Sequence, residues 1–239
     1  MVSNGVGLSV AMLLGSASTI WVGQFSKPGA PPAPWHMVKM SSARPTDYRV
    51  AVVQGKPAVE ARVDKSMSVL VRPIRIDLAK TPVLCWRWLV SGPVRNADMT
   101  KKSGDDYAAR VYVAFDVPDS ALSGSTKFKL RMARGLFGKD LPDAAVVYVW
   151  DNRNPVGTAR KSSYTDRSQL IVAETGGARA GSWVSERVDL ASDYAKAFRN
   201  QPGTPTQIAV AADGDNTKSS GRAAFADIQF VARNQQCDF

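Results

Sequence analysis

Ten short apolar or alternating runs, each closed by glycine, proline, asparagine or aspartate, limit the folds open to this chain. Runs of this length that are rich in β-branched and aromatic residues are typical of strands, and the punctuation between them indicates turns. A helical protein would instead show apolar residues three and four positions apart over longer stretches. The runs are 47–55, 57–64, 67–77, 82–90, 106–116, 145–151, 168–175, 183–190, 206–213 and 223–231.

This pattern predicts an all-β fold, an antiparallel β-sandwich or jelly roll. One short helix is expected near the C-terminal third, over 191–200, where a Gln-Pro-Gly sequence ends it. A chain of 239 residues is long enough for one such sandwich. We therefore expect a single domain over 41–239, preceded by a Pro-rich connector over 23–40 that cannot be helical.

The N-terminal segment 1–22 is predicted to be a signal peptide or an N-terminal membrane anchor. Residues 5–22 form the only long uncharged run, and small residues at 16–18 resemble a cleavage zone. The run is also close to the length of a membrane span, and a buried core helix is the third interpretation. We expect the protein to be periplasmic or otherwise exported, either free or anchored at the membrane.

The chain is strongly basic, with a formal net charge of +10 and a pI near 9.8. Such a balance indicates an anionic partner, although it can also serve solubility alone. Nucleic acid is the least favoured of the anionic partners, because no recognition helix or RNA-binding aromatic motif is present and export is expected. Phospholipid headgroups and acidic polysaccharides remain.

Histidine and cysteine are scarce. With one histidine, His36, the chain cannot form a multi-histidine metal site, and a Ser-His-Asp triad would depend on a residue in a Pro-rich stretch. Cys85 and Cys237 form no C-x-x-C pair, which argues against zinc and thioredoxin-like sites. Cys85 is either a small buried residue of a strand or, in an exported protein, the partner of Cys237 in a disulfide.

Alternation along the run 106–116 separates a polar face from an apolar one. Unpaired charge in a core is heavily penalised, so we expect Asp106, Arg110 and Tyr112 to line the outer or concave surface of a sheet. Arg110 is expected to hold Asp106 as an ion pair there. The apolar face of the run consists of Tyr107, Ala109, Val111, Val113 and Phe115.

Two aromatic pairs, Trp86 with Trp88 and Tyr148 with Trp150, allow two interpretations. On a concave sheet such rings could stack against sugar rings, whereas in a sandwich they fill the core. Large aromatic residues are usually buried, so core packing is favoured for at least one pair. Tyr148 and Trp150 are kept as candidate ligand-binding residues.

The segment 213–217, Asp-Gly-Asp-Asn-Thr, supplies the closely spaced oxygens that calcium prefers, from Asp213, Asp215 and Asn216. These three residues are candidate ligand-binding residues. The segment lacks the spacing and the downstream glutamate of an EF-hand loop. A turn is the other interpretation, with a positive φ at Gly214.

Several of these segments together resemble the domain of unknown function 3047 family of bacterial exported proteins, from about Phe25 to Phe230. They are TPVLCWRWLV, GDDYAARVYVAFD, VVYVW, GSWVSERVDLASDYAKAF and DGDNTKSSGRAAFADIQF. The family has no established activity, so the resemblance implies compartment and fold. Phe198-Arg199 departs from the Phe-Gly that the family usually carries.

More loosely, the layout resembles jelly-roll carbohydrate-binding modules. Those open with a phenylalanine and a tryptophan, here Phe25 and Trp35, and close with an Asp-Ile-x-Phe strand that here begins at Asp227. The resemblance implies a structural calcium near the closing strand, although 25–31 lacks the acidic residue that follows the phenylalanine. The expected calcium ligands are Asp213, Asp215 and Asp227.

We expect a non-catalytic exported β-sandwich protein that binds a glycan or another anionic envelope component. The alternative is a structural or accessory subunit of a larger membrane or envelope complex. Its docking surface would use basic residues of loops and edges, namely Lys101, Lys102, Lys127, Lys129, Arg131 and Arg134.

An enzyme is less favoured than either of these two roles, although it ranks above nucleic-acid binding. The carboxylate pairs Asp105 with Asp106 and Asp213 with Asp215 could in principle serve glycoside hydrolysis. Adjacent residues of a strand point to opposite faces, however, so Asp105 and Asp106 make a poor acid and base pair.

Overall fold

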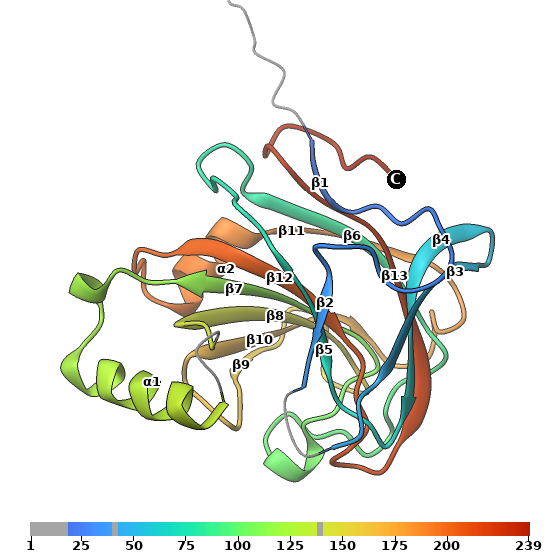
Figure 1. Ribbon diagram of the computed structural model, residues 1–239, viewed down its shortest axis with the longest axis horizontal. Helices are drawn as coiled ribbons and strands as arrows, with labels where there is room; N and C mark the ends of the chain where they lie inside the picture. Colours follow the sequence, from blue (N-terminus) through green and yellow to red (C-terminus); the bar gives the residue numbers. More distant parts are fainter. Residues whose placement is uncertain (1–18, 40–42, 138–140) are drawn as a thin grey trace, which may run out of the picture.

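Two β-sheets pack face to face in the computed structural model, which describes residues 19–39, 43–137 and 141–239 (Figure 1). The predicted β-sandwich is therefore confirmed. Sheet A has six strands. Five of them lie in the order β11 (Val184–Asp189), β6 (Val83–Val90), β13 (Ser220–Val231), β4 (Lys56–Asp64) and β3 (Asp47–Val53). The sixth, β1 (Ile20–Gly23), pairs with β13. Sheet B has seven strands, in the order β2 (His36–Val38), β5 (Val69–Pro73), β12 (Thr204–Ala211), β7 (Arg110–Asp116), β8 (Ala144–Asp151), β10 (Ser168–Thr175) and β9 (Ala159–Lys161).

The chain crosses repeatedly between the two sheets, as in a jelly roll. Strands β3 and β4 lie in sheet A, β5 in sheet B, β6 in sheet A and β7 to β10 in sheet B. Strands β11, β12 and β13 then alternate between the sheets. Each of the ten predicted runs supplies one of these strands.

One strand pair departs from the antiparallel prediction, because β10 runs parallel to β8. A parallel pair needs a crossover of a dozen or more residues, and 152–167 provides it. The short strand β9 lies inside this crossover and pairs antiparallel with β10. Strands β1, β2 and β9 are three or four residues long, too short for a periodic signal in the sequence.

The described residues include two α-helices, α1 (Gly124–Phe137) and α2 (Leu190–Ala197), and two short 3-10 helices, Lys102–Gly104 and Asp119–Ala121. Helix α2 matches the predicted short helix. Helix α1 is not predicted, because Phe128, Leu130 and Met132 alternate and so hide a helical period. Within the described ranges, neither helix is long and apolar enough to cross a membrane.

Aromatic rings from β6 and β8 fill the space between the sheets. Trp86 and Trp88 meet edge to face with ring centroids 5.2 Å apart. Tyr148 lies 5.3 Å from Trp86, and Trp150 lies 5.7 Å from Trp88. Such ring pairs contribute roughly 0.5–1.5 kcal/mol each beyond the burial of their area. Both aromatic pairs of the sequence therefore belong to the core.

The prediction that Tyr148 and Trp150 contact a ligand is wrong. Strand β8 turns both side chains toward sheet A, where Tyr148 is 0% and Trp150 is 1% exposed. Their polar atoms are also used internally, since Tyr148 donates to Asp193 over 2.8 Å and the Trp150 indole donates to the Gly176 carbonyl over 2.9 Å.

Cys85 and Cys237 form a disulfide, with their Cα atoms 6.1 Å apart. Cys85 is also fully buried in β6. It is therefore both a buried strand residue and the partner of Cys237, which the sequence presented as alternatives. The bond ties the C-terminal segment to sheet A.

Most of the predicted signal peptide or anchor, residues 1–18, lies outside the described residues. Residues 20–23 form β1, which pairs with β13 at one end of sheet A. In the predicted connector, Phe25 and Trp35 are buried with ring centroids 5.8 Å apart, and 36–38 form β2. The segment 19–39 thus contributes strands and core rings to the sandwich.

Candidate functional site

A buried polar cluster forms where the start of β7 meets the end of β12. Arg110 begins β7 opposite Ala211 of β12, and Asp213 follows two residues later. The Arg110 guanidinium donates from Nε to Asp213 Oδ1 over 2.8 Å and from Nη2 to Asp213 Oδ2. Arg110 is 4% exposed and Asp213 is 2% exposed. This two-pronged contact joins the loop after β12 to β7.

The loop before β7 wraps around the same arginine. Arg110 donates to the Asp105 carbonyl, and its Nη1 lies 3.5 Å from Asp105 Oδ2. The Tyr107 N–H donates to Asp213 Oδ1 over 3.2 Å, and the Arg110 guanidinium lies 4.4 Å from the centre of the Tyr107 ring. Residues 105–109 form a loop, because β7 begins only at Arg110. Tyr107 consequently does not belong to the predicted apolar face and packs on the outer side of sheet B.

Asp106 holds the turn that follows β12. Its carboxylate accepts the Thr217 hydroxyl over 2.6 Å and the Asn216 N–H over 3.3 Å. The Asn216 amide also donates to the Asp105 carbonyl over 3.4 Å. The predicted ion pair between Arg110 and Asp106 is wrong, because Arg110 pairs with Asp213 and Asp105 instead.

The turn depends on glycine at position 214. A Cβ there would fall on the Ser219 carbonyl, and the Gly214 carbonyl itself accepts the Ser219 N–H over 2.9 Å. The requirement is close approach of two backbone segments and not the predicted positive φ.

The cluster carries more negative than positive charge, with four aspartates around Arg110. Asp105 Oδ1 and Asp215 Oδ1 are buried without a hydrogen-bond partner among the described residues. Burial raises the pKa of Asp213 to about 7, although Arg110 opposes the shift. Burial and the nearby Asp106 carboxylate also raise the pKa of Asp215. This arrangement favours the uptake of protons or of a cation.

Three carboxylates of the cluster are close enough to share one ion. One oxygen from each lies within 4.8 Å of the others; the residues are Asp106, Asp213 and Asp215. Oxygens that bind one calcium at about 2.3–2.6 Å can lie this far apart. The predicted ligand Asp227 is wrong, since its Oδ2 lies on β13 of sheet A, 2.6 Å from Arg87 and 3.4 Å from Lys56.

The predicted exposed surface of Asp106, Arg110 and Tyr112 is not exposed. Asp106 is 0% exposed, Arg110 is buried with it, and Tyr112 is half-buried. Of the eight candidate ligand-binding residues, the structure brings five into one buried cluster and leaves Tyr112 beside it on the outer face of sheet B. The five are Asp106, Arg110, Asp213, Asp215 and Asn216.

A loop covers the outer face of sheet B. Val147 and Val149 alternate with core residues of β8 and so face away from sheet A. Met99 and Tyr107 pack on them, together with the ring of Tyr112. Alternation along β7 correctly predicts that Arg110 and Tyr112 point to the outer face of sheet B. It cannot predict that the loop carrying Met99 and Tyr107 covers this face.

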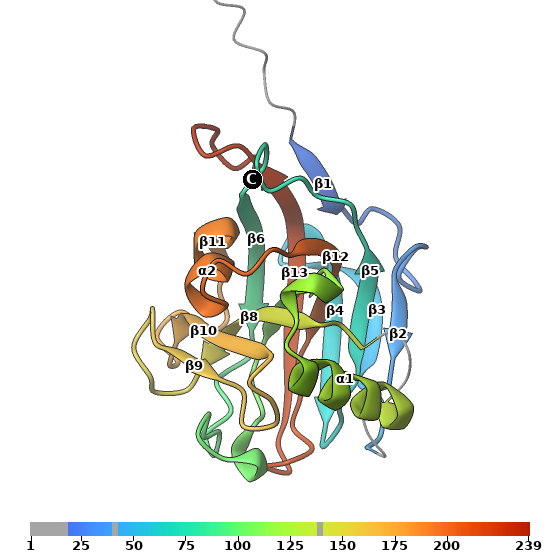
Figure 2. The ribbon, with the colours of Figure 1, turned by 90° about the vertical axis from the view of Figure 1, so that its left-hand side faces the viewer.

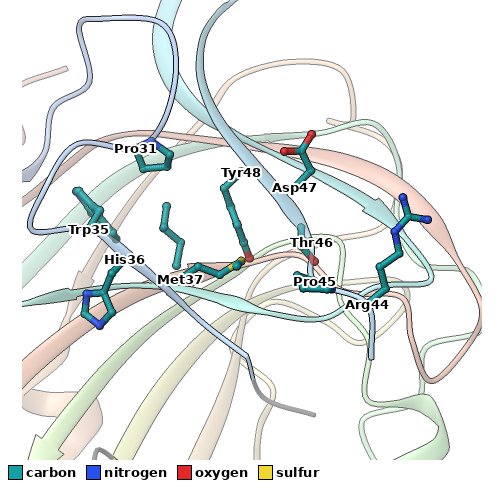
Figure 3. A pocket seen from close by; sticks show the side chains of 10 residues that line it. Pro31, Trp35, His36, Met37, Arg44, Pro45, Thr46, Asp47 and Tyr48 are labelled. Carbon is teal, nitrogen blue, oxygen red and sulfur yellow. The ribbon is translucent and has the colours of Figure 1, made fainter. Parts of the chain in front are cut away.

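An open pocket of about 540 Å³ lies where the edge strand β2 of sheet B faces the edge strand β3 of sheet A (Figure 3). In Figure 3, Trp35 and His36 lie on one side, Arg44 and Pro45 on the other, and Tyr48 between them. The lining residues are Pro31, Trp35, His36, Met37, Arg44, Pro45, Thr46, Asp47, Tyr48 and Leu70.

The two rings of this pocket are fixed from behind. The Tyr48 hydroxyl donates to the Ser68 carbonyl over 2.6 Å, and Trp35 packs on Phe25. At the rim, Met37 is 46% exposed, and the exposed Arg44 pairs with Asp64 over 3.0 Å. The pocket therefore joins fixed aromatic walls to exposed polar and charged groups at its rim.

Sequence reasoning did not find this pocket. Trp35 and His36 stand in a Pro-rich stretch and Tyr48 in a separate run, so no local pattern links them. Their side chains meet only because two edge strands, each from a different sheet, lie opposite one another.

A family model described as "Protein of unknown function (DUF3047)" matches residues 33–229. The chain belongs to the DUF3047 family. This confirms the resemblance expected from the five sequence segments. No curated protein is detectably similar to this DUF3047 chain.

Several solved structures are similar to the DUF3047 chain at low scores. A family 30 carbohydrate-binding module of a cellulosomal cellulase from Clostridium thermocellum is 10% identical, with 91% of this chain and 99% of that chain covered and a TM-score of 0.42. The family GH12 endoglucanase 3 of Trichoderma harzianum is 8% identical, with coverage of 84% and 100% and a TM-score of 0.40. Endoglucanase Cel12A of Rhodothermus marinus is 7% identical, with coverage of 82% and 92% and a TM-score of 0.43. At these scores the likeness carries no information on what this chain binds or does.

Proposed function

We propose that this DUF3047 protein binds a saccharide in the pocket between β2 and β3. The observation that carries the proposal is the pairing of two fixed rings, Trp35 and Tyr48, with exposed polar groups on one rim. Ligand sites commonly combine apolar and aromatic walls with a few polar groups and enclose about 300–1,000 Å³. Sugar rings present an apolar face to such walls and hydroxyl groups to such a rim.

The pocket favours binding over hydrolysis. Among its described lining residues, Asp47 is the one carboxylate, and it is paired with Arg49 over 2.9 Å. Glycoside hydrolysis by the usual route needs two carboxyl groups on either side of the bond. The carboxylates of the buried cluster do not line the pocket.

An anionic saccharide of the bacterial envelope fits the charge of the protein. Arg44 and His36 are exposed at the rim, and the chain carries a formal charge of +10. The Cys85–Cys237 disulfide supports an oxidising compartment such as the periplasm. The predicted N-terminal signal peptide or anchor supports the same compartment.

Binding to purified peptidoglycan and to an array of neutral and acidic glycans tests the proposal. We expect the wild-type protein to bind at least one of these saccharides, and Trp35→Ala to bind it at least tenfold more weakly. His36→Ala and Arg44→Ala, which alter exposed rim residues, should each weaken binding about threefold or more. Thermal unfolding of each variant separates lost binding from lost folding.

Arg160→Ala is the matched control, because Arg160 is an exposed arginine of β9, at the opposite edge of sheet B from β2, and does not line the pocket. We expect it to bind as the wild type does. The proposal fails if no saccharide binds, or if the rim variants and Arg160→Ala bind equally well.

We also propose that the buried cluster holds a structural calcium ion. The support is the surplus of buried negative charge, the oxygen spacing of three aspartates, and the unpartnered Asp105 Oδ1 and Asp215 Oδ1. A bound cation would replace the protons that these carboxylates otherwise favour, and it would stabilise the turn 213–217 against Asp106.

Thermal unfolding in EDTA and in calcium chloride tests this ion. At a calcium concentration about one hundred times the Kd, binding adds about 2.7 kcal/mol to the free energy of unfolding. This corresponds to a rise in Tm of about 5–10 °C for a domain of this size. Asp215→Asn should lose the rise, whereas Asp166→Asn, which alters an exposed aspartate outside the cluster, should keep it. A calcium-independent Tm in the wild type would contradict the proposal.

A further inference from the structure

Helix α1 presents an apolar ridge to solvent. Phe128 is 63% exposed and Met132 is 54% exposed, and they stand one helical turn apart on the same face. Figures 1 and 2 show α1 at the periphery of the molecule, outside both sheets. Of the exposed large apolar residues in the described part of the chain, these two lie on the same helix and next to each other on its surface.

The opposite side of α1 attaches it to the sandwich and so determines which face points outward. Leu130 is buried in the core cluster, and at about 100° per residue it lies almost opposite Phe128 and Met132. Arg134 donates to Asp143 over 2.8 Å and to the Leu141 carbonyl over 3.1 Å. The burial of Leu130 and the hydrogen bonds of Arg134 fix the orientation of α1, so that Phe128 and Met132 point away from the sandwich.

Cations flank the ridge. Lys129 and Arg131 lie on either side of it, about 60–100° around the helix from Phe128. Both are exposed and have no ion-pair partner among the described residues. The sequence of α1, GSTKFKLRMARGLF, contains four basic residues and no acidic residue. Of these four, Arg134 pairs with Asp143, whereas Lys129 and Arg131 extend into solvent beside the ridge.

We propose that α1 is a docking element for an anionic lipid surface, with Phe128 and Met132 entering the acyl boundary and Lys129 and Arg131 contacting the headgroups. Interfacial helices combine an apolar face with flanking lysine and arginine in this way. The inference does not depend on the pocket between β2 and β3, which involves no residue of α1.

Charge complementarity selects a lipid surface over an apolar protein partner. A protein groove that accepts Phe128 and Met132 would have to place acidic groups on both flanks of the helix. An anionic membrane supplies negative charge on every side, and each nearby lysine or arginine adds about fivefold to membrane partitioning. The basic balance of the whole chain acts in the same direction.

Partitioning of the full-length protein onto vesicles tests the proposal. Vesicles of phosphatidylethanolamine with phosphatidylglycerol serve as the anionic surface, and phosphatidylcholine vesicles serve as the neutral one. We expect wild-type protein to sediment with the anionic vesicles only, and less so at high salt. Lys129→Gln/Arg131→Gln should weaken partitioning about 25-fold, and Phe128→Ser/Met132→Ser by about tenfold or more.

Each double variant has a matched control elsewhere on the surface. Lys80→Gln/Arg49→Gln removes the same two charges from side chains that are 81% and 61% exposed. Val52→Ser/Val156→Ser removes two exposed apolar side chains outside the helix. Both controls should partition as the wild type does, and unchanged Tm values should show that all four variants fold.

A second measurement reports insertion directly. The ring of a Phe128→Trp variant should be quenched by brominated acyl chains in anionic vesicles, whereas a Val52→Trp variant should not be. The proposal is overturned if the helix variants and the controls weaken equally, which would indicate overall charge alone. It is also overturned if the protein binds neutral vesicles as well, or binds a soluble anionic polysaccharide through α1 without binding vesicles.

Discussion

Replacing Arg110 with leucine removes the cation that contacts Asp213 and leaves an apolar side chain at the start of β7. Asp213 is 2% exposed and would lose both guanidinium contacts. Breaking a buried pair in this way costs about 3–5 kcal/mol, because an uncompensated charge remains in the interior. For a domain of this size, the corresponding fall in Tm is about 6–20 °C.

The loss of stability should depend on pH. In the wild type, burial raises the pKa of Asp213 to about 7 although Arg110 opposes the shift, so the carboxyl is charged at pH 8 and mostly neutral at pH 5. Removing Arg110 raises this pKa further, so at pH 8 the variant must either bury an unpaired anion or take up a proton. At pH 5 both proteins bury a neutral carboxyl, and the loss should shrink to about 1–3 kcal/mol. The double variant Arg110→Leu/Asp213→Asn removes the anion as well and should recover at least half of the loss at pH 8.

Urea unfolding in EDTA at pH 8 and pH 5 measures these differences as shifts of the midpoint at constant m-value. Arg49→Leu is the matched control, because Arg49 forms an exposed ion pair with Asp47 that should contribute less than about 1 kcal/mol. Two results would refute the reasoning. One is a loss for Arg110→Leu no larger than that for Arg49→Leu, and the other is a double variant no more stable than Arg110→Leu at pH 8.

Three further predictions concern stability. Burial raises the pKa of Glu186 to about 7, so its proton is held more tightly in the folded state, and stability should fall by about 3 kcal/mol as the pH rises from about 4.5 to about 7. Glu186→Gln should abolish most of that fall in urea titrations, and an unchanged pH profile would count against it. Reducing the Cys85–Cys237 bond, which joins residues 152 positions apart, should lower the free energy of unfolding by up to about 5 kcal/mol, and an unchanged urea midpoint after reduction and alkylation would contradict this. Trp150→Ala should cost about 3–5 kcal/mol through its core cavity, and an unchanged Tm would show that the ring is not core.

Strand positions could be read from the sequence because each depends on local alternation. In β6, Leu84, Trp86, Trp88 and Val90 face sheet B as the alternating pattern predicts, since side chains of a strand must point to opposite sides. The same logic failed at Tyr107, because the strand begins at Arg110, four residues later than the predicted run 106–116. It also missed α1, whose apolar residues alternate like those of a strand.

The members of the buried cluster were predictable only in part. Closely spaced aspartates and an asparagine mark 213–217 as a turn or a ligand loop, and Asp106 and Arg110 stand out as charges in a strand-like run. Their mutual distances depend on β7 and β12 being neighbours in sheet B, about a hundred residues apart along the chain. No local pattern could exclude Asp227, which the resemblance to carbohydrate-binding modules placed among the expected calcium ligands.

Alternation and turn chemistry are short-range properties, so the amino-acid sequence was sufficient for the sandwich, for most strand boundaries and for the division of each strand into two faces. Exposure is a long-range property, because it depends on which distant segment covers a face. The loop that carries Met99 and Tyr107 buries the outer side of β8, and the opposition of β2 and β3 opens a pocket around Trp35. Both outcomes follow from the packing of remote segments, which only the assembled fold reveals.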